Sequence, residues 1–240
     1  MMGQLIHGDL PKELMLQLKG KYALEDFIET GTYQGGTAVW AAAHFDRVTT
    51  IEFSRSLYEE TKAQHDGASN LSFLFGDSRE ALRAIVPTLQ QPAIFWLDSH
   101  WSGGQTYGQN DECPLLEEIE AITSSVHTHF LFIDDARLFA APPPRPHRID
   151  QWPTIDEVIG ALTSTSHRYY IVIIEDVIVA VPEHARALVA SYCQEVNTRA
   201  WQEFGRNREK GVKRNGLQRM MQRLGALAYG LRMPFKRFRC

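Results

Sequence analysis

The sequence predicts an α/β fold: a doubly wound, mostly parallel seven-stranded sheet with a terminal antiparallel hairpin, followed by a helical C-terminal extension. Two observations lead to this prediction. Short apolar runs alternate with helix-like segments over most of the chain, which is the pattern of strands joined by right-handed crossover helices. The alternation then stops, and two β-rich runs flank a short polar turn.

Five near-continuous apolar runs have the character of central strands, because parallel strands covered on both faces lose the apolar–polar alternation. They lie at 25–30, 47–53, 71–77, 93–98 and 129–134. Helices are predicted between them, over 35–45, 54–66, 78–90 and 113–125. Ser54 and Ser78 are the expected N-caps of two of these helices, and Pro114 suits a first helical position.

The end of the sheet has a different pattern. After the proline cluster at 142–146, a helix is predicted near 154–162. Residues 169–182 then contain two β-rich runs on either side of Glu175 and Asp176. This arrangement predicts an antiparallel hairpin.

Composition places the chain among ordinary globular proteins, with 44% hydrophobic residues and a formal net charge of −4. No run approaches the roughly 18 apolar residues of a membrane span, and the first residues lack the pattern of a secretory signal. We therefore expect a cytoplasmic protein. Its three widely spaced cysteines, Cys113, Cys193 and Cys240, are expected to be reduced thiols.

Charge separates the chain into two parts, a domain over 1–182, with an N-terminal helical segment at 1–24, and a basic helical extension over 183–240. From Arg199 onward there are 12 Lys and Arg against 2 Asp and Glu. An amphipathic helix is predicted near 217–233. We expect it to pack on the domain or on a second subunit of a homo-oligomer. Peripheral contact with the anionic inner face of a membrane and contact with nucleic acid are the alternatives.

The first strand runs into "IETGTYQGGT" (28–37), an acid followed by a glycine-rich loop. A nicotinamide site needs G-x-G-x-x-G, and Tyr33 occupies the second of those glycine positions. Gly31 permits a tight turn and a close approach of the backbone. Glu52 ends the second strand 21 residues after Gly31, where an acid can accept ribose hydroxyls, and Asp77 ends the third.

This glycine loop resembles motif I of the class I S-adenosylmethionine-dependent methyltransferases, which have a Rossmann-like fold. The resemblance implies that Glu29 reaches the ammonium group of the methyl donor through the loop or water. It also implies that Glu52 binds the ribose and that Asp77 accepts from the adenine amino group. Taken singly, such strand-terminal acids are more often helix caps or solvent anchors. The other residues predicted to contact the donor are Gly31, Thr32, Tyr33, Gly35, Gly36, Thr37, Phe53, Ser78 and Asp98.

A second group of acids follows the fourth and fifth strands, Asp98 in "FWLDSHWSGG" and Asp134 with Asp135 in "LFIDDARLF". Ligands of open α/β sheets bind at the carboxyl ends of the strands, so we expect these side chains to meet. Three neighbouring carboxylates repel one another. A divalent cation that prefers oxygen ligands, Mg²⁺ or else Ca²⁺ or Mn²⁺, relieves that repulsion.

The segments "LDSHWSGG", "CPLLEEIE" and "FIDDAR" resemble metal-dependent O-methyltransferases of the catechol and macrocin types, and bacterial methyltransferase-like proteins of glycan or natural-product pathways. The resemblance covers roughly residues 25–182. It implies that Asp98, Asp134 and Asp135 hold Mg²⁺. Catechol-type enzymes place a lysine base three residues after the first acid, whereas this sequence has Trp101 there. We therefore predict His100 and Asp98 as catalytic residues, with His100 as the base for a metal-bound sugar or polyketide hydroxyl.

Simpler roles exist for each of these residues. The Asp134–Asp135 pair could cap the following segment and bind Arg137, and His100 could be a hydrogen-bonded loop residue. Trp101 and Tyr107 could cover the pocket as a lid or stack on a sugar ring.

The function also has alternatives. Nucleic-acid methylation is suggested by the basic tail, but no N-P-P-Y-like tetrad follows the fourth strand. A protein that binds the donor without turnover is the non-enzymatic alternative.

Overall fold

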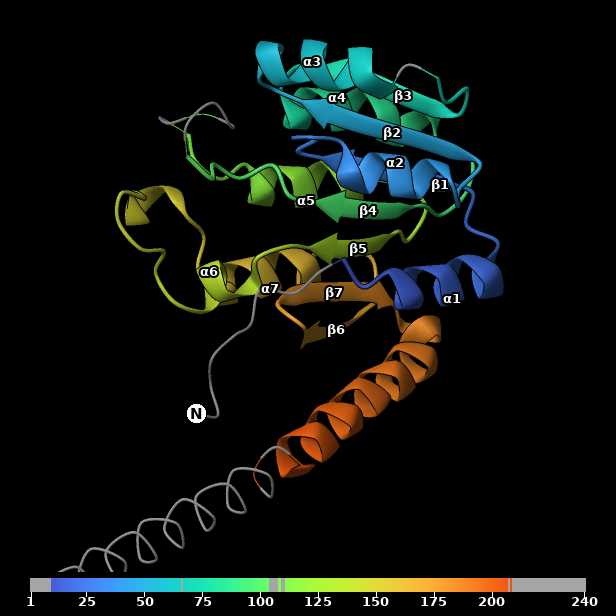
Figure 1. Cartoon of the computed structure of the whole chain (residues 1–240), viewed down its shortest axis with the longest axis vertical. Coiled ribbons are helices and arrows are strands. Elements are labelled where there is room, and N and C mark those ends of the chain that lie inside the picture. Colours follow the sequence, from blue (N-terminus) through green and yellow to red (C-terminus); the bar gives the residue numbers. More distant parts are fainter. Residues whose placement is uncertain (1–9, 66, 104–107, 109–110, 207, 209–240) are drawn as a thin grey trace, which may run out of the picture. The chain divides into compact units, whose positions relative to one another are not determined.

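The computed structural model describes residues 10–65, 67–103, 108, 111–206 and 208. Within this part, seven strands form one sheet in the order β3-β2-β1-β4-β5-β7-β6 (Figure 1). The strands are β1 (Asp26–Thr30), β2 (Arg47–Glu52), β3 (Leu71–Phe75), β4 (Ile94–Leu97), β5 (Phe130–Ile133), β6 (Tyr169–Ile174) and β7 (Val177–Pro182). The predicted fold class is confirmed, and each of the seven predicted strands lies where the apolar runs placed it.

Strands β3, β2, β1, β4 and β5 are parallel, while β7 runs antiparallel to both β5 and β6. The β6–β7 connection is the predicted two-residue turn, in which Glu175 and Asp176 have φ values of 49° and 69°. Positive φ at both central residues is the conformation that matches the twist of a tight hairpin. Every residue of β1, β4, β5 and β7 is buried, which explains their near-continuous apolar sequences.

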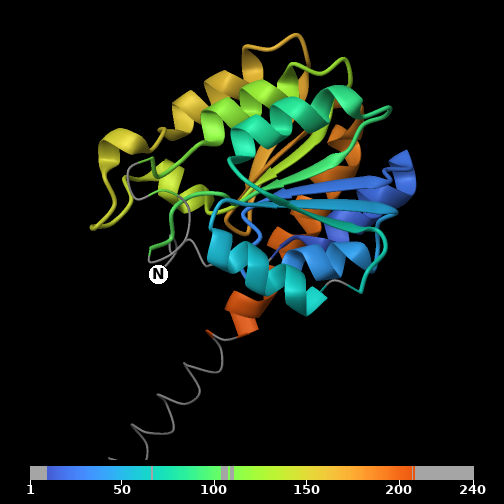
Figure 2. The ribbon, with the colours of Figure 1, turned by 90° about the horizontal axis from the view of Figure 1, so that it is seen from above.

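Helices cover both faces of this sheet. Figure 2 shows α4, α5 and α7 along one face, with α2 and α3 on the other. The helices labelled in Figure 1 are α1 (Lys12–Tyr22), α2 (Gly36–Ala42), α3 (Arg55–His65), α4 (Ser78–Ile85), α5 (Leu115–Thr123), α6 (Ala136–Ala140) and α7 (Ile155–Thr163). Short 3₁₀ turns follow at Val86–Thr88, Ile149–Gln151 and Glu183–Ala185.

Two helix starts differ from the prediction by one residue. Asp77, and not Ser78, is the N-cap of α4: its backbone is extended and its side chain accepts from the Arg79 N–H at 2.9 Å. Ser78 is the first residue inside that helix, so the predicted cap at Ser78 was wrong. Pro114 is the residue before α5 and not its first residue. Helix α7 begins with a capping box between Thr154 and Glu157.

The chain divides into two units, Met1–Val189 and Ala190–Cys240, whereas the sequence placed the boundary after Pro182. In the first unit, α1 packs near β5, with the rings of Tyr22 and Phe130 5.5 Å apart. In the second unit, residues 190–206 are helical. The predicted amphipathic helix at 217–233 lies outside the described residues. No helix in the described ranges is both long and apolar enough to cross a membrane.

Candidate functional site

The carboxyl ends of the central strands meet at Gly31, directly after β1. Its φ is +84°, and a Cβ there would overlap the carbonyl oxygen of Asp98 at the end of β4. The Gly31 N–H donates to the carbonyl of Ile51 in β2 at 3.0 Å. Only glycine can therefore bring this loop so close to the neighbouring strand ends.

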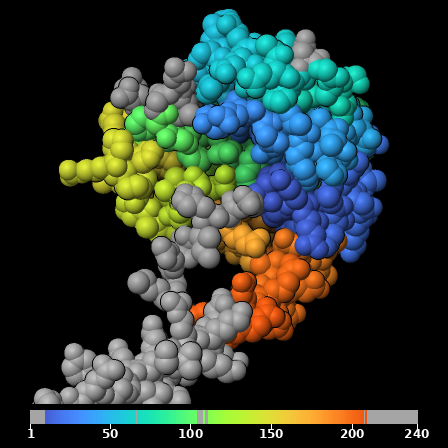
Figure 3. All heavy atoms as spheres, viewed as in Figure 1, coloured from blue at the N-terminus to red at the C-terminus, as the bar shows by residue number. Residues whose placement is uncertain are grey.

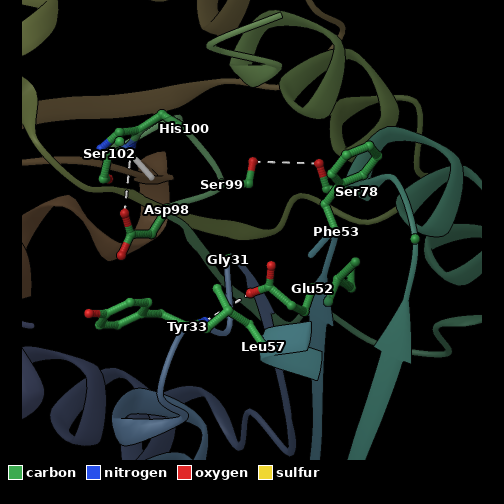
Figure 4. Close-up of a pocket in the computed structure, with 13 residues that line it drawn as sticks. Gly31, Tyr33, Glu52, Phe53, Leu57, Ser78, Asp98, Ser99, His100 and Ser102 are labelled. Atoms are coloured by element: carbon green, nitrogen blue, oxygen red, sulfur yellow. Dashed lines mark hydrogen bonds and ion pairs between the residues drawn. The ribbon is translucent and has the colours of Figure 1, made fainter. Parts of the chain in front are cut away.

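A cavity of about 400 Å³ opens at this edge and is called the first cavity below. Six residues predicted to contact the donor line it, and Figure 4 shows them around one space: Gly31, Tyr33, Glu52, Phe53, Ser78 and Asp98. The remaining lining residues were not predicted as donor contacts: Ile51, Leu57, Gly76, Ser99, His100, Ser102 and Gly103. Its volume falls in the range of small-molecule sites, which is about 300–1,000 Å³.

Glu52 is fixed at the end of β2 by backbone donors. One carboxylate oxygen accepts from the Tyr33 N–H at 3.0 Å and the other from the Ser54 N–H at 2.8 Å. A carboxylate has about four acceptor positions, so each Glu52 oxygen can accept one further bond. The carboxylate borders the first cavity, as a residue that binds two neighbouring hydroxyls must.

Glu29 lies beneath this site and does not line the first cavity. It is 2% exposed and accepts from the Thr50 hydroxyl at 2.5 Å. Burial raises the pKa of Glu29 to about 8, with the charges of Asp98 and Glu52 adding to the effect. The contact of Glu29 with the donor's ammonium group therefore stays a prediction. It would have to be made through the loop or a water molecule, as the sequence-based prediction assumed.

Asp77, at the end of β3, is also absent from the cavity wall. Its carboxylate caps α4 and pairs with the Arg79 guanidinium at 2.6 Å. These contacts lower the pKa of Asp77, the side-chain hydrogen bond from Arg79 being the largest cause. The predicted adenine contact by Asp77 stays a prediction, while its neighbours Gly76 and Ser78 do border the cavity.

Four further predicted donor residues build the loop without lining the cavity. The Thr32 hydroxyl lies 2.6 Å from that of Thr50, and Thr37 contacts the Glu29 carboxyl. Gly35, with φ +76°, is the N-cap of α2, and Gly36 is the first residue of that helix.

His100 joins two of the acids that follow β4 and β5. Its Nε2 lies 3.0 Å from an Asp135 carboxylate oxygen, and its Nδ1 lies 3.6 Å from one of Asp98 (the latter in Figure 4). The residue is 8% exposed. Burial opposes a charge on the ring, but the Asp135 hydrogen bond and the surrounding carboxylates outweigh it, so the pKa of His100 is raised.

The three acids have unlike environments. Burial, together with repulsion from the other two carboxylates, raises the pKa of Asp98 to about 7. Burial and the charge of Asp135 raise the pKa of Asp134 to about 6. Burial acts in the same direction on Asp135, but His100 and Arg137 outweigh it and lower its pKa. The carboxylates lie close enough to perturb one another's pKa values, and the shared site predicted from the sequence stays a prediction.

The same arrangement does not fit the predicted metal centre. The imidazole of His100 stands between Asp98 and Asp135, and Asp134 accepts from the Asp135 N–H at 2.8 Å. Among residues 10–65, 67–103, 108, 111–206 and 208, no group of three His, Cys, Asp or Glu side chains is placed to hold a metal ion. Asp135 instead contacts His100 and Arg137, and His100 is also the neighbour of Asp98.

Arg137 holds the turn after β5 in place. Its guanidinium pairs with Asp135 at 2.6 Å and with Asp176, and its N–H donates to Asp176 at 2.8 Å. Asp176 is 2% exposed. The simpler role weighed for Asp135, pairing with Arg137, is therefore present, and the hairpin turn supplies a second acid that sequence reasoning missed.

A second cavity of about 550 Å³ lies on the other side of His100. The segments after β4 and after β5, green and yellow-green in Figure 3, lie side by side on the surface. The cavity is lined by His100, Trp101, Ser102, Asp135, Arg137, Leu138, Ala141, Pro142, Pro144 and His147. His100 and Ser102 thus border both cavities. Tyr107, predicted to belong to a lid, lies outside the described residues.

Comparison with solved structures identifies the architecture. A caffeoyl-CoA O-methyltransferase-like protein from Staphylococcus aureus matches with a TM-score of 0.53 and 14% identity, over 72% of this chain and 84% of that one. A protein from Clostridium thermocellum, provisionally named an rRNA methylase, matches with a TM-score of 0.51 and 7% identity, over 72% and 97%. The chain has the class I methyltransferase fold.

At these identities the likeness establishes the methyltransferase fold and nothing finer. No protein-family model matches the sequence, and the search of curated proteins finds no significant match.

Buried acids behind the cavities were missed from sequence. Glu118 in α5 is 1% exposed, and it accepts from the Ser99 hydroxyl at 2.6 Å directly behind the first cavity. Burial raises its pKa, although hydrogen bonds from Ser78 and Ser99 oppose the rise. Glu118 lies in a segment with an ordinary amphipathic pattern. The apolar residues one helical turn away from it were the only sequence feature that indicated burial.

Proposed function

We propose that this protein is an S-adenosylmethionine-dependent O-methyltransferase that methylates a hydroxyl of a sugar, a glycan or a natural product. The observation that supports this most directly is the position of His100 and Ser102, which border both cavities. A donor in the first cavity and an acceptor in the second can meet there.

The first cavity suits the donor because its walls combine the required chemistries. Glu52 offers acceptor positions for ribose hydroxyls, and Phe53 and Leu57 offer apolar surface for the adenine ring. The glycine loop lets the backbone approach closely at Gly31. In the class I fold this is the end of the sheet where ligands bind.

The chemical step requires a base, because an alcohol is a poor nucleophile near neutral pH. Asp135 accepts from Nε2–H of a neutral His100, which leaves Nδ1 to take the acceptor's proton. The acceptor oxygen attacks the sulfonium methyl carbon in line. A new C–O bond forms while the methyl C–S bond breaks, and its electron pair stays on sulfur, giving S-adenosylhomocysteine.

The second cavity suits an acceptor with an apolar face and a reactive hydroxyl. Leu138, Pro142 and Pro144 supply apolar wall, and the polar groups gather near His100 and Arg137. Trp101 is 7% exposed, and its indole N–H has no hydrogen-bond partner within the described part of the chain. An oxygen of the bound acceptor can satisfy this buried donor.

The sequence also predicted a divalent cation at this site. The proton transfer and the methyl transfer proposed here do not require one. A cation bound by Asp98, Asp134 and Asp135 must displace His100 from its place between the first and the last of these acids. Chelation therefore separates the two mechanisms. With His100 as the base, turnover survives EDTA, whereas a cation mechanism loses it and recovers with Mg²⁺.

The experiment has two arms. Calorimetry measures binding of S-adenosylhomocysteine, and transfer of a labelled methyl group is followed with methyl glycosides and with aromatic and polyketide alcohols. The proposal predicts donor binding together with methylation of at least one compound at its oxygen, and loss of transfer in His100→Ala. Donor binding without transfer to any compound favours the non-catalytic alternative, and absence of donor binding overturns the proposal.

Nucleic-acid methylation is a second candidate because residues 199–240 carry 12 basic and 2 acidic side chains. Binding driven by this segment should weaken steeply with salt and show no sequence preference. A labelled-methyl assay on RNA and DNA at physiological salt decides between the candidates. Incorporation into nucleic acid but not into any small hydroxyl compound favours this second function.

A further inference from the structure

Glu112, in the segment between β4 and α5, is a buried acid to which the mechanism above gives no role. It is 1% exposed. One carboxylate oxygen accepts from the Trp152 indole N–H at 2.6 Å, and both accept from the Arg148 N–H at 3.1 Å. His147 Nδ1 lies 3.3 Å away. A buried carboxylate is tolerated where donors of this kind surround it.

These contacts connect two segments that are far apart in the chain. The Glu112 N–H donates to the Gln151 side chain at 3.2 Å, and its carbonyl accepts from the Trp101 N–H at 2.7 Å. The ring of His147 lies 5.2 Å from that of Trp101 and 5.2 Å from that of Trp152. Trp101 and His147 both line the second cavity. Glu112 therefore holds together two walls of that cavity.

The same residue reaches His100 by two routes. The Trp152 ring lies 5.3 Å from the imidazole with the planes inclined by 59°. Trp152 is 6% exposed, and its ring also packs against that of Phe139 at a centroid distance of 5.9 Å. The second route is the backbone, because the Glu112 carbonyl fixes Trp101, the residue directly after His100.

We propose that Glu112 is a positioning residue: it fixes Trp152 and the 147–152 segment so that His100 and the walls of the second cavity keep their reactive arrangement. This inference rests on the proposed methyl transfer. Glu112 touches neither cavity in the described structure, so it acts through its neighbours.

The test compares Glu112→Gln with the wild type. Glutamine has nearly the same shape but no charge, and its NH₂ group replaces one carboxylate oxygen. In either orientation of the amide a donor then faces the Arg148 N–H, and in one of them it also faces the Trp152 indole N–H. Trp152→Phe removes the indole N–H together with part of the ring, and serves if the glutamine variant does not fold. Glu120→Gln, on the exposed side of α5, is the matched control for loss of a charge.

Two readouts need no acceptor. In a ¹H–¹⁵N spectrum, the indole signal that disappears in Trp152→Phe belongs to Trp152, and it should move in Glu112→Gln but not in Glu120→Gln. The ring signals of His100, assigned with His100→Asn, should shift or broaden in Glu112→Gln and in Trp152→Phe. Calorimetry with S-adenosylhomocysteine should give the wild-type affinity in Glu112→Gln, Trp152→Phe and Glu120→Gln.

The third readout uses the panel compound that the wild type methylates fastest. Because misplacement of a catalytic group by about 1 Å costs on the order of 100-fold in rate, kcat should fall by about 10- to 100-fold in Glu112→Gln while the donor KM is unchanged. Wild-type His100 signals and wild-type kcat in a folded Glu112→Gln protein overturn the proposal. If no compound is methylated, the proposed function fails, and the His100 signals still decide whether Glu112 holds the imidazole.

Discussion

The imidazole Nε2 of His100 lies 3.0 Å from a carboxylate oxygen of Asp135, although the two residues follow different strands. The contact exists because β4 and β5 are adjacent and parallel, which brings their carboxyl ends to one edge. Asp135 is held in turn by Arg137, and Arg137 by the buried Asp176 of the hairpin turn. A hydrogen-bonded chain thus runs from the last pair of strands to the proposed base.

Removal of the imidazole should slow catalysis strongly. We expect His100→Ala to lower kcat by about 10²- to 10⁴-fold, the usual contribution of a general base. Asp135→Asn should have a smaller effect, because it disturbs the orientation of the ring without removing it. Steady-state transfer of a labelled methyl group measures both. His127→Ala, a partly exposed histidine before β5, is the control, and wild-type turnover in His100→Ala contradicts the assignment.

Glu52 should contribute to donor affinity through the ribose. Hydrogen bonds to a charged group contribute about 1.5–3 kcal/mol, so Glu52→Ala should weaken binding of S-adenosylhomocysteine by roughly 10- to 100-fold. Calorimetry with an analogue that lacks the 2′-hydroxyl provides the decisive comparison. The wild type should lose affinity for this analogue, whereas Glu52→Ala should bind both ligands alike. If Glu52→Ala loses as much affinity as the wild type when the 2′-hydroxyl is removed, Glu52 does not bind that hydroxyl.

Gly31 should tolerate no side chain. An added Cβ meets the backbone carbonyl of Asp98, and φ of +84° is itself unfavourable for alanine. Strain of this kind costs about 1–3 kcal/mol, so Gly31→Ala should lower the free energy of unfolding in urea and weaken donor binding. Gly20→Ala is the matched control, since its Cβ meets nothing within 4 Å. Equal stability of the two variants contradicts the packing described.

The sheet could be predicted because its determinants are local and repetitive. Apolar runs such as those of β4 and β5 specify burial on both faces, and acids directly after them, such as Asp98, necessarily gather at one edge. The buried acids could not be predicted, since Asp and Glu are almost never fully buried unless paired. The partners that permit burial of Glu112 are 35–40 residues away in sequence.

The roles within the site were harder to predict than its members. Three carboxylates at one edge suggest a cation that offsets their charges. Sequence spacing does not show which other side chains lie between them. The structure places His100 there and pairs Asp135 with Arg137. The same limit applied to α4, where two adjacent capping residues, Asp77 and Ser78, offered equivalent starts and only the backbone conformation decided between them.

Glu29 should make the stability of the protein depend on pH. Burial raises its pKa to about 8 from an ordinary value of 4.5, so the folded protein keeps a proton that the unfolded chain releases above pH 4.5. The contribution of this residue to the free energy of unfolding is therefore largest at or below pH 4.5. It falls as the pH rises from there to about 8 and is fully lost above that value.

Glu29→Gln imitates the protonated side chain and can still accept from the Thr50 hydroxyl. In urea denaturation the wild type should lose stability between pH 5 and pH 9. Glu29→Gln should lose less over the same interval, because its side chain has no proton to release. Glu60→Gln, exposed on α3, removes a charge without removing a buried carboxyl and should leave the pH dependence of the wild type unchanged. A wild-type pH dependence in Glu29→Gln shows that this carboxyl is already ionised in the folded protein at neutral pH.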